Sequence, residues 1–182
     1  MPSYSYQAYR RNARAAAARQ QIKPNKNQEQ IEKAREDFGF FCEYVADKPP
    51  ATHHKEWNKH FITSLDTKCL LKIGGPNIDL LAPRGSAKST VLGLLTAWAI
   101  GVHTTAGQPL QILYLSYTVD IARSKSATIK RIIESKKYQE VFPKVKLLKN
   151  VTSNEYWSID HRFAGIDTTG EEQFTLCAAG LK

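Results

Sequence analysis

Cysteine is scarce in this chain of 182 residues, and the three that occur are widely spaced. They stand at Cys42, Cys69 and Cys177 without a Cys-x-x-Cys pair, which argues against a disulfide framework or a cysteine-based zinc site. We therefore expect reduced thiols. The adjacent His53 and His54 have no cysteine or carboxylate at ligand spacing, so we expect no metal site there either.

Long apolar runs are also missing. The longest, Val91–Val102, is interrupted by Thr96 and is too short to cross a bilayer, so the sequence predicts no membrane contact. Apolar residues nevertheless make up 42% of the chain, which is ordinary for a globular protein and enough for one domain with a proper core. We find no internal repeat.

Acidic residues are absent before Glu29, although six basic residues precede it. The net charge is +9, and residues 118–150 add a second surplus, with nine lysines and arginines against three acids. Such a field attracts polyanions, nucleic acid first, although a solvated basic surface is the alternative. We interpret residues 1–27 as a basic flexible arm for DNA or a partner. An acid-free start rich in Arg and Ala also resembles a mitochondrial presequence.

Apolar periodicity divides the remainder into alternating helices and strands. This alternation predicts an α/β fold with a mainly parallel sheet flanked by helices. The expected helices cover 28–46, 53–64 after Thr52, 91–101 and a long stretch from Thr118 or Asp120 to Ser135. In the last of these, the expected buried positions are Ile121, Thr128, Ile129, Ile132 and Ile133. The expected strands cover 68–73, 77–82, 110–117, 156–159 and 174–178.

The most informative stretch is Leu80–Thr90, in which an apolar run leads through a short loop into a helix. That is the context of a P-loop, whose consensus is G-x-x-x-x-G-K-[ST]. Glycine is lacking at both consensus positions, which fall at Ala82 and Ala87, while Lys88 and Ser89 match. A simple strand-to-helix turn with a surface lysine is the alternative interpretation.

Physical chemistry favours a variant phosphate loop. Gly85 can supply the unusual backbone angle, and the small Ala87 lets the backbone approach a phosphate. Lys88 would reach the β and γ phosphates, and the Ser89 hydroxyl would bind Mg²⁺. Arg84 adds a second cation, so Arg84 and Lys88 are the candidate catalytic residues. The expected nucleotide-binding residues of the loop are Pro83, Arg84, Gly85, Ser86, Ala87, Lys88, Ser89 and Thr90.

An ordered set of motifs over roughly residues 36–182 resembles the N-terminal ATPase domain of bacteriophage large terminases, the DNA-packaging motors. The set comprises Thr-His-His-Lys-Glu-Trp at 52–57, Ala-Pro-Arg-Gly-Ser-Ala-Lys-Ser-Thr at 82–90, Leu-Tyr-Leu-Ser-Tyr at 113–117 with Ala122, and Ile-Ile-Glu-Ser-Lys-Lys-Tyr followed by Val-Phe-Pro at 132–143. The resemblance implies a P-loop NTPase fold that uses ATP and Mg²⁺, with Trp57 and His54 near the adenine. Trp57 on an apolar helix face is equally well explained as a core residue.

The resemblance also implies partners and a place of work. These are double-stranded DNA, a portal, a small terminase subunit and a homo-oligomeric ring, in the host cytoplasm. The family next carries a Walker B strand that ends in two acids. We find none, because Asp160 and Asp167 follow no apolar run and Glu171–Glu172 lies in a polar stretch. We therefore expect 28–182 to be an ATPase portion incomplete at its C-terminal end, without Walker B or the nuclease domain, and open to completion by a second polypeptide.

A positioned general base contributes about 10²–10⁴ to rate, so we expect weak ATP binding and slow turnover by this chain. Two other functions stay open. One is a nucleic-acid-binding or interaction protein with a relic P-loop, and the other is a fragment of a helicase-like translocase. A small-molecule kinase fits less well, because the chain leaves little room for a lid and a substrate pocket.

Overall fold

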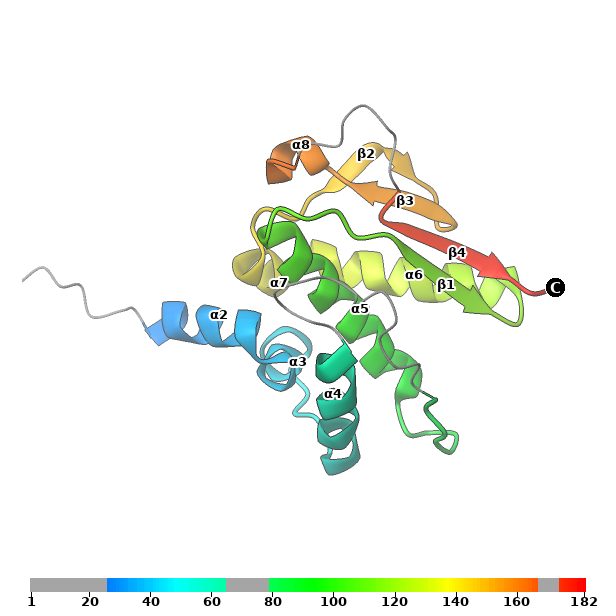
Figure 1. The fold of residues 1–182 in the computed structure, drawn as a ribbon, viewed down its shortest axis with the longest axis horizontal. Helices are drawn as coiled ribbons and strands as arrows, with labels where there is room; N and C mark the ends of the chain where they lie inside the picture. Colours follow the sequence, from blue (N-terminus) through cyan, green and yellow to red (C-terminus); the bar gives the residue numbers. More distant parts are fainter. Residues whose placement is uncertain (1–25, 65–78, 167–173) are drawn as a thin grey trace, which may run out of the picture.

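The fold is α/β, and Figure 1 shows its helices and its open sheet. The computed structural model describes residues 26–64, 79–166 and 174–182, and these contain seven helices and a four-strand sheet. The helices are α2 (Lys26–Glu36), α3 (Phe38–Ala46), α4 (Thr52–Ser64), α5 (Lys88–Thr105), α6 (Val119–Glu134), α7 (Lys136–Val141) and α8 (His161–Ala164). The strands are β1 (Ile112–Ser116), β2 (Leu147–Thr152), β3 (Tyr156–Ile159) and β4 (Leu176–Gly180).

The sheet is mixed, with the strand order β1-β4-β3-β2. Only β1 and β4 run parallel, whereas β3 pairs antiparallel with both of its neighbours. The expectation of a mainly parallel sheet is therefore wrong for the described strands. The physical reason is the β2–β3 hairpin, because a short turn between strands forces them to run antiparallel. Strand β2 was not expected from the sequence, since its two polar residues Lys149 and Asn150 interrupt the apolar pattern.

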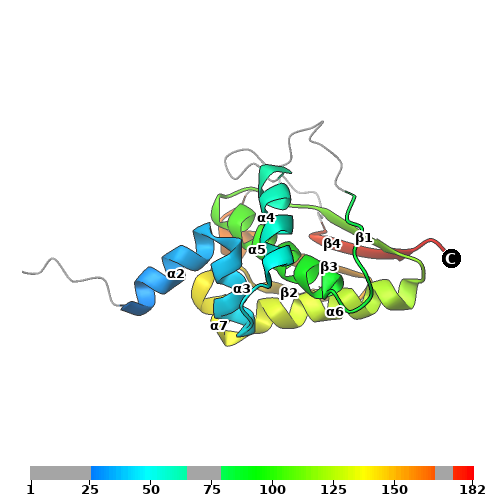
Figure 2. The ribbon, with the colours of Figure 1, turned by 90° about the horizontal axis from the view of Figure 1, so that it is seen from below.

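Helix α6 covers one face of the β1–β4 pair (Figure 2). Side chains alternate across a strand, so Leu176 and Trp157 point toward α6, where the Trp157 Nε1–H donates to Ser126 Oγ at 2.8 Å. The alternate positions of β1 point away from α6. Within the described part of the chain, Leu113 and Leu115 remain 60% and 52% exposed. Among the described residues, helices therefore cover only one face of the sheet at β1.

A second packed region joins the N-terminal helices to α5 and α7. Its buried aromatic side chains are Phe38, Phe41, Trp98, Tyr138 and Phe142. Two buried hydrogen bonds fix its polar atoms, from Trp98 Nε1 to the Ala34 carbonyl at 3.2 Å and from the Tyr138 hydroxyl to the Ala97 carbonyl at 2.8 Å. Because buried Tyr and Trp usually need a partner for their polar atom, these bonds make the packing of α2 and α7 on α5 specific.

Several expectations about the elements need correction. The single helix expected over 28–46 is two helices, because Asp37 ends α2 and caps α3 by accepting a hydrogen bond from the Phe40 N–H at 3.0 Å. In α6, Ile129 and Ile133 are buried as expected, whereas Ile121 is 47% exposed and Thr128 is also exposed. Thr118 does cap α6, accepting from the Ile121 N–H at 3.4 Å. The expected N-terminal arm falls almost wholly outside the described residues.

Two of the cysteines belong to the described part and are free thiols, Cys42 in α3 and Cys177 in β4. Burial, with a smaller contribution from Asp37, raises the pKa of the Cys42 thiol to about 12, so this side chain behaves as a small apolar group. Cys69 lies outside the described residues. None of the described helices combines the length and the apolar character that crossing a membrane requires.

Candidate phosphate-binding loop

The loop at 83–87 leads into a helix as expected, but no strand precedes it among the described residues. Residues 79–82 carry no regular structure, and 77–78 fall outside the described part, so the expected strand over 77–82 is not confirmed. Residues Pro83–Ser86 form a turn, with the Ser86 N–H 3.4 Å and the Ser86 hydroxyl 2.8 Å from the Pro83 carbonyl. Helix α5 then begins at Lys88 and continues for 18 residues.

Two residues of the loop, Gly85 and Ala87, have a left-handed backbone conformation. Gly85 has a φ of 85°, where glycine is favoured and open space surrounds its α-carbon. Ala87, which stands at the second consensus glycine, also has a positive φ of 57° with a ψ of 20°. An alanine reaches this conformation at a cost of about 1–2 kcal/mol. The loop therefore keeps a glycine-like backbone at position 87 without glycine.

We expect Ala87→Gly to raise the melting temperature by about 2 °C, because relief of the positive φ outweighs the extra chain entropy of glycine. The matched control is Ala127→Gly in the interior of α6, where helical φ and ψ make glycine unfavourable by about 1 kcal/mol. Differential scanning calorimetry should therefore find shifts of opposite sign. A fall in both variants would contradict the strain that we assign to Ala87.

The N-terminus of α5 has no side-chain cap, since Ala87 occupies the cap position. The first N–H groups bonded within the helix are those of Thr90 and Val91, both to the Ala87 carbonyl at 3.0 Å. The N–H groups of Ala87, Lys88 and Ser89 find no backbone acceptor in the described part of the chain. Consecutive free N–H groups at the positive end of a helix dipole suit an anion.

The polar side chains around these N–H groups are accessible. Ser89 and Thr90 are exposed in the first turn of α5, and Arg84 is exposed at the turn of the loop. Lys88 is half-buried, and its Nζ donates to the Ala82 carbonyl, so the ammonium group folds back across the loop. The expected loop residues thus lie in one turn and the first turn of α5, with Arg84 exposed in the turn and the Lys88 ammonium group folded back over the loop.

The structure also brings His54 to this loop, through a contact that the sequence did not predict. The His54 Nε2 atom lies 2.9 Å from the Ser86 carbonyl oxygen, which joins α4 to the loop. Trp57 is half-buried and contacts the imidazole of His54, with ring centroids 5.1 Å apart. His53 completes this aromatic cluster at 4.1 Å from His54. The position near the adenine that the resemblance implies for His54 stays a prediction, and the bond to the loop backbone is an additional contact.

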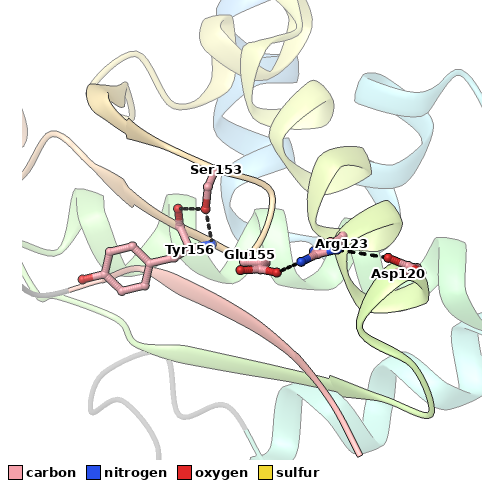
Figure 3. Close-up of polar contacts among 5 residues, drawn as sticks. All are labelled: Asp120, Arg123, Ser153, Glu155 and Tyr156. Carbon is pink, nitrogen blue, oxygen red and sulfur yellow. Dashed lines mark hydrogen bonds and ion pairs between the residues drawn. The ribbon is translucent and has the colours of Figure 1, made fainter. Parts of the chain in front are cut away.

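Two basic side chains of α6, which belong to the basic stretch 118–150, make contacts within the fold. Figure 3 shows Arg123 between two carboxylates, at 3.1 Å from Asp120 and in an ion pair with Glu155 of the β2–β3 turn. The Lys130 ammonium likewise donates to the Ser153 carbonyl at 3.2 Å, and burial lowers its pKa. These two cations stabilise the hairpin on α6, so they contribute less to a surface for phosphates than the charge count suggested.

Helix α4 also lines a cavity outside the candidate phosphate loop. A cavity of about 430 Å³ between α3, Pro49–Pro50 and α4 is lined in part by Lys55, Asn58 and Lys59. Asn58 is 6% exposed, and its side-chain oxygen has no hydrogen-bond partner among the described residues. Mixed charges line this cavity, and the phosphate loop takes no part in it. No group of three or more metal-ligating side chains occurs among the described residues.

The loop, the uncapped α5 terminus and the His54 contact form the candidate site. Comparison of the chain with models of protein families, with curated proteins and with solved structures gives no significant match. The assignment of function therefore rests on the residues and the geometry of the chain itself.

Proposed function

We propose that this chain is the ATP-binding portion of a DNA-translocating ATPase of the large-terminase type. One observation carries the proposal. At the start of α5 a left-handed Ala87 leads into a helix whose first N–H groups, those of Ala87, Lys88 and Ser89, have no backbone acceptor among the described residues. This arrangement offers a phosphate chain backbone donors, an ammonium group and a hydroxyl for Mg²⁺. The turn at Gly85 and the cation of Arg84 support the same proposal.

The same residues indicate binding better than hydrolysis. Asp160 is not placed as a Walker B acid, because its Oδ1 caps α8 by accepting from the Phe163 N–H at 3.0 Å. Strand β4 has the sequence Leu-Cys-Ala-Ala-Gly and supplies no carboxylate. If no carboxylate outside the described residues serves as the base, the phosphate site would hold ATP–Mg²⁺ and turn it over slowly. A second polypeptide is the proposed source of the missing acid and of a nuclease.

Double-stranded DNA is the proposed substrate of translocation, with a portal, a small terminase subunit and a ring of copies as partners, in the host cytoplasm. The net charge of +9 supports a polyanionic partner. It favours the relic alternative equally, in which the chain binds nucleic acid or a protein and the loop no longer binds nucleotide. A helicase-like translocase shares the loop and the basic α6.

Calorimetric titration of the chain with ATP, with and without Mg²⁺, tests the proposed site. We expect Mg²⁺ to tighten binding by about tenfold, a gain that Ser89→Ala abolishes because the hydroxyl no longer reaches the metal. The matched control, Ser124→Ala, removes an exposed serine hydroxyl from α6 and should keep the full effect of Mg²⁺. DNA binding without any ATP binding would favour the relic alternative.

A further inference from the structure

The hydrogen bonds of His54 define which of its nitrogens carries the proton. Its Nδ1 lies 3.3 Å from the Ala51 backbone nitrogen, which can only donate. Nδ1 must therefore accept, and in the neutral ring the proton is on Nε2. The Nε2–H then donates to the Ser86 carbonyl oxygen, 2.9 Å away. A single imidazole thus accepts from the turn before α4 and donates to the loop before α5.

The Ser86 carbonyl belongs to the same peptide unit as the Ala87 N–H. No cis peptide bond occurs in the described chain, and in a trans peptide the C=O and N–H groups point in opposite directions. A carbonyl bonded to His54 therefore directs the Ala87 N–H away from α4. That N–H is the first of the three at the α5 terminus that have no backbone acceptor among the described residues.

This peptide unit has an alternative orientation. Ala87 has a positive φ that costs an alanine free energy, so rotation of the Ser86–Ala87 peptide would relieve the backbone. After such a rotation the carbonyl oxygen would face the phosphate side and repel an anion. The bond to His54 opposes this rotation, and the ring of Trp57 packs against the imidazole, with the two ring centroids 5.1 Å apart.

We propose that His54 is a positioning residue that fixes the Ser86–Ala87 peptide so that the Ala87 N–H serves as a phosphate donor. The inference rests on the proposed phosphate site and deepens it. It differs from an adenine contact, because it makes His54 act on the phosphate chain through the loop backbone. A ligand without a base, such as inorganic tripolyphosphate, would depend on His54 as much as ATP does.

The test compares three variants by calorimetry with ATP–Mg²⁺ and with tripolyphosphate–Mg²⁺. We expect His54→Ala to weaken both ligands by about tenfold, the value of one lost hydrogen bond and one misdirected donor. His54→Gln should stay within about twofold of the unchanged protein, because its amide supplies one donor and one acceptor. The matched control is His53→Ala, since His53 lies on the same helix and contributes ring contacts without a bond to the loop.

Three results would overturn the inference. The first is unchanged affinity in His54→Ala, and the second is a loss for ATP with none for tripolyphosphate, which would indicate an adenine contact. The third is an equal loss in all three variants with a lower melting temperature, which would indicate a general role of α4 in folding. Lys88→Ala distinguishes failure of the proposed phosphate site from failure of the role that we assign to His54. If the unchanged protein binds tripolyphosphate and Lys88→Ala does not, the phosphate site stands and His54 alone is in question, whereas no binding by the unchanged protein refutes both.

Discussion

Lys88→Ala should lose ATP–Mg²⁺ affinity by about 100-fold, the largest functional effect that we expect of any single substitution. The Lys88 ammonium lies across the loop on the Ala82 carbonyl, and the backbone N–H groups of residues 87–89 have no backbone acceptor in the described part of the chain. A phosphate chain bound at that terminus would exchange this neutral acceptor for charged oxygens, and hydrogen bonds between charged groups are the strong ones. Calorimetric titration with ATP–Mg²⁺ measures the loss directly.

The control for this substitution is Lys144→Ala, which removes an equal charge from an exposed position between α7 and β2. It should change affinity little, because a single exposed charge outside the proposed site is screened by salt. A Lys88→Ala protein that binds ATP as tightly as the Lys144→Ala protein would contradict the proposed phosphate site. The nucleic-acid-binding alternative with a relic loop would then be the better interpretation.

Trp157→Ala should lower the free energy of unfolding by about 3–5 kcal/mol, the largest stability effect that we expect. Trp157 lies in β3 and is fully buried, and its indole N–H donates to Ser126 Oγ on α6 at 2.8 Å. Removal of the ring leaves a cavity between sheet and helix and an unpaired hydroxyl inside it. Urea unfolding followed by far-UV circular dichroism gives the difference.

Two control variants interpret this loss of stability. The first separates the packing of the ring from its hydrogen bond, and the second removes an exposed ring. Trp157→Phe keeps most of the ring but loses the donor, so we expect a smaller loss of about 1–2 kcal/mol. Phe163→Ala removes an aromatic ring that is 58% exposed on α8, and we expect less than about 1 kcal/mol. A Trp157→Ala protein no less stable than Phe163→Ala would mean that the β3–α6 contact does not stabilise the fold.

The sequence predicted those elements whose periodicity is strong. The apolar run at 91–101 became part of α5, the run at 110–117 contains β1, and Thr118 caps α6 as its residue type suggested. Strand β2 was not foreseen because Lys149 and Asn150 interrupt its apolar pattern, and the helices α7 and α8, of six and four residues, are too short to show a helical period. The direction of β3 depends on pairing between distant segments, which local patterns do not encode.

At the site, the sequence predicted the loop and the helix that follows it. Small residues followed by Lys-Ser-Thr are typical of the turn that leads into the first helix of a phosphate loop. The backbone angle of Ala87 could not be predicted, since alanine rarely adopts a positive φ. The bond from His54 to Ser86 spans 32 positions and depends on how α4 packs beside the loop. The only signal in the sequence was the pair of histidines ahead of Trp57. A local pattern does not predict which distant residues these histidines contact in the fold.

The partial exposure of Trp57 makes its fluorescence accessible to quenchers in solution. Of its three tryptophans, Trp98 is 2% exposed and Trp157 fully buried, whereas Trp57 is half-buried in the cluster with His53 and His54. A dissolved quencher such as iodide therefore reaches Trp57 far more readily than the other two indoles. Trp57 contacts His54, and His54 contacts Ser86 of the loop. Binding of a ligand at the loop should therefore change the fluorescence that iodide can quench, and no added dye is needed to follow it.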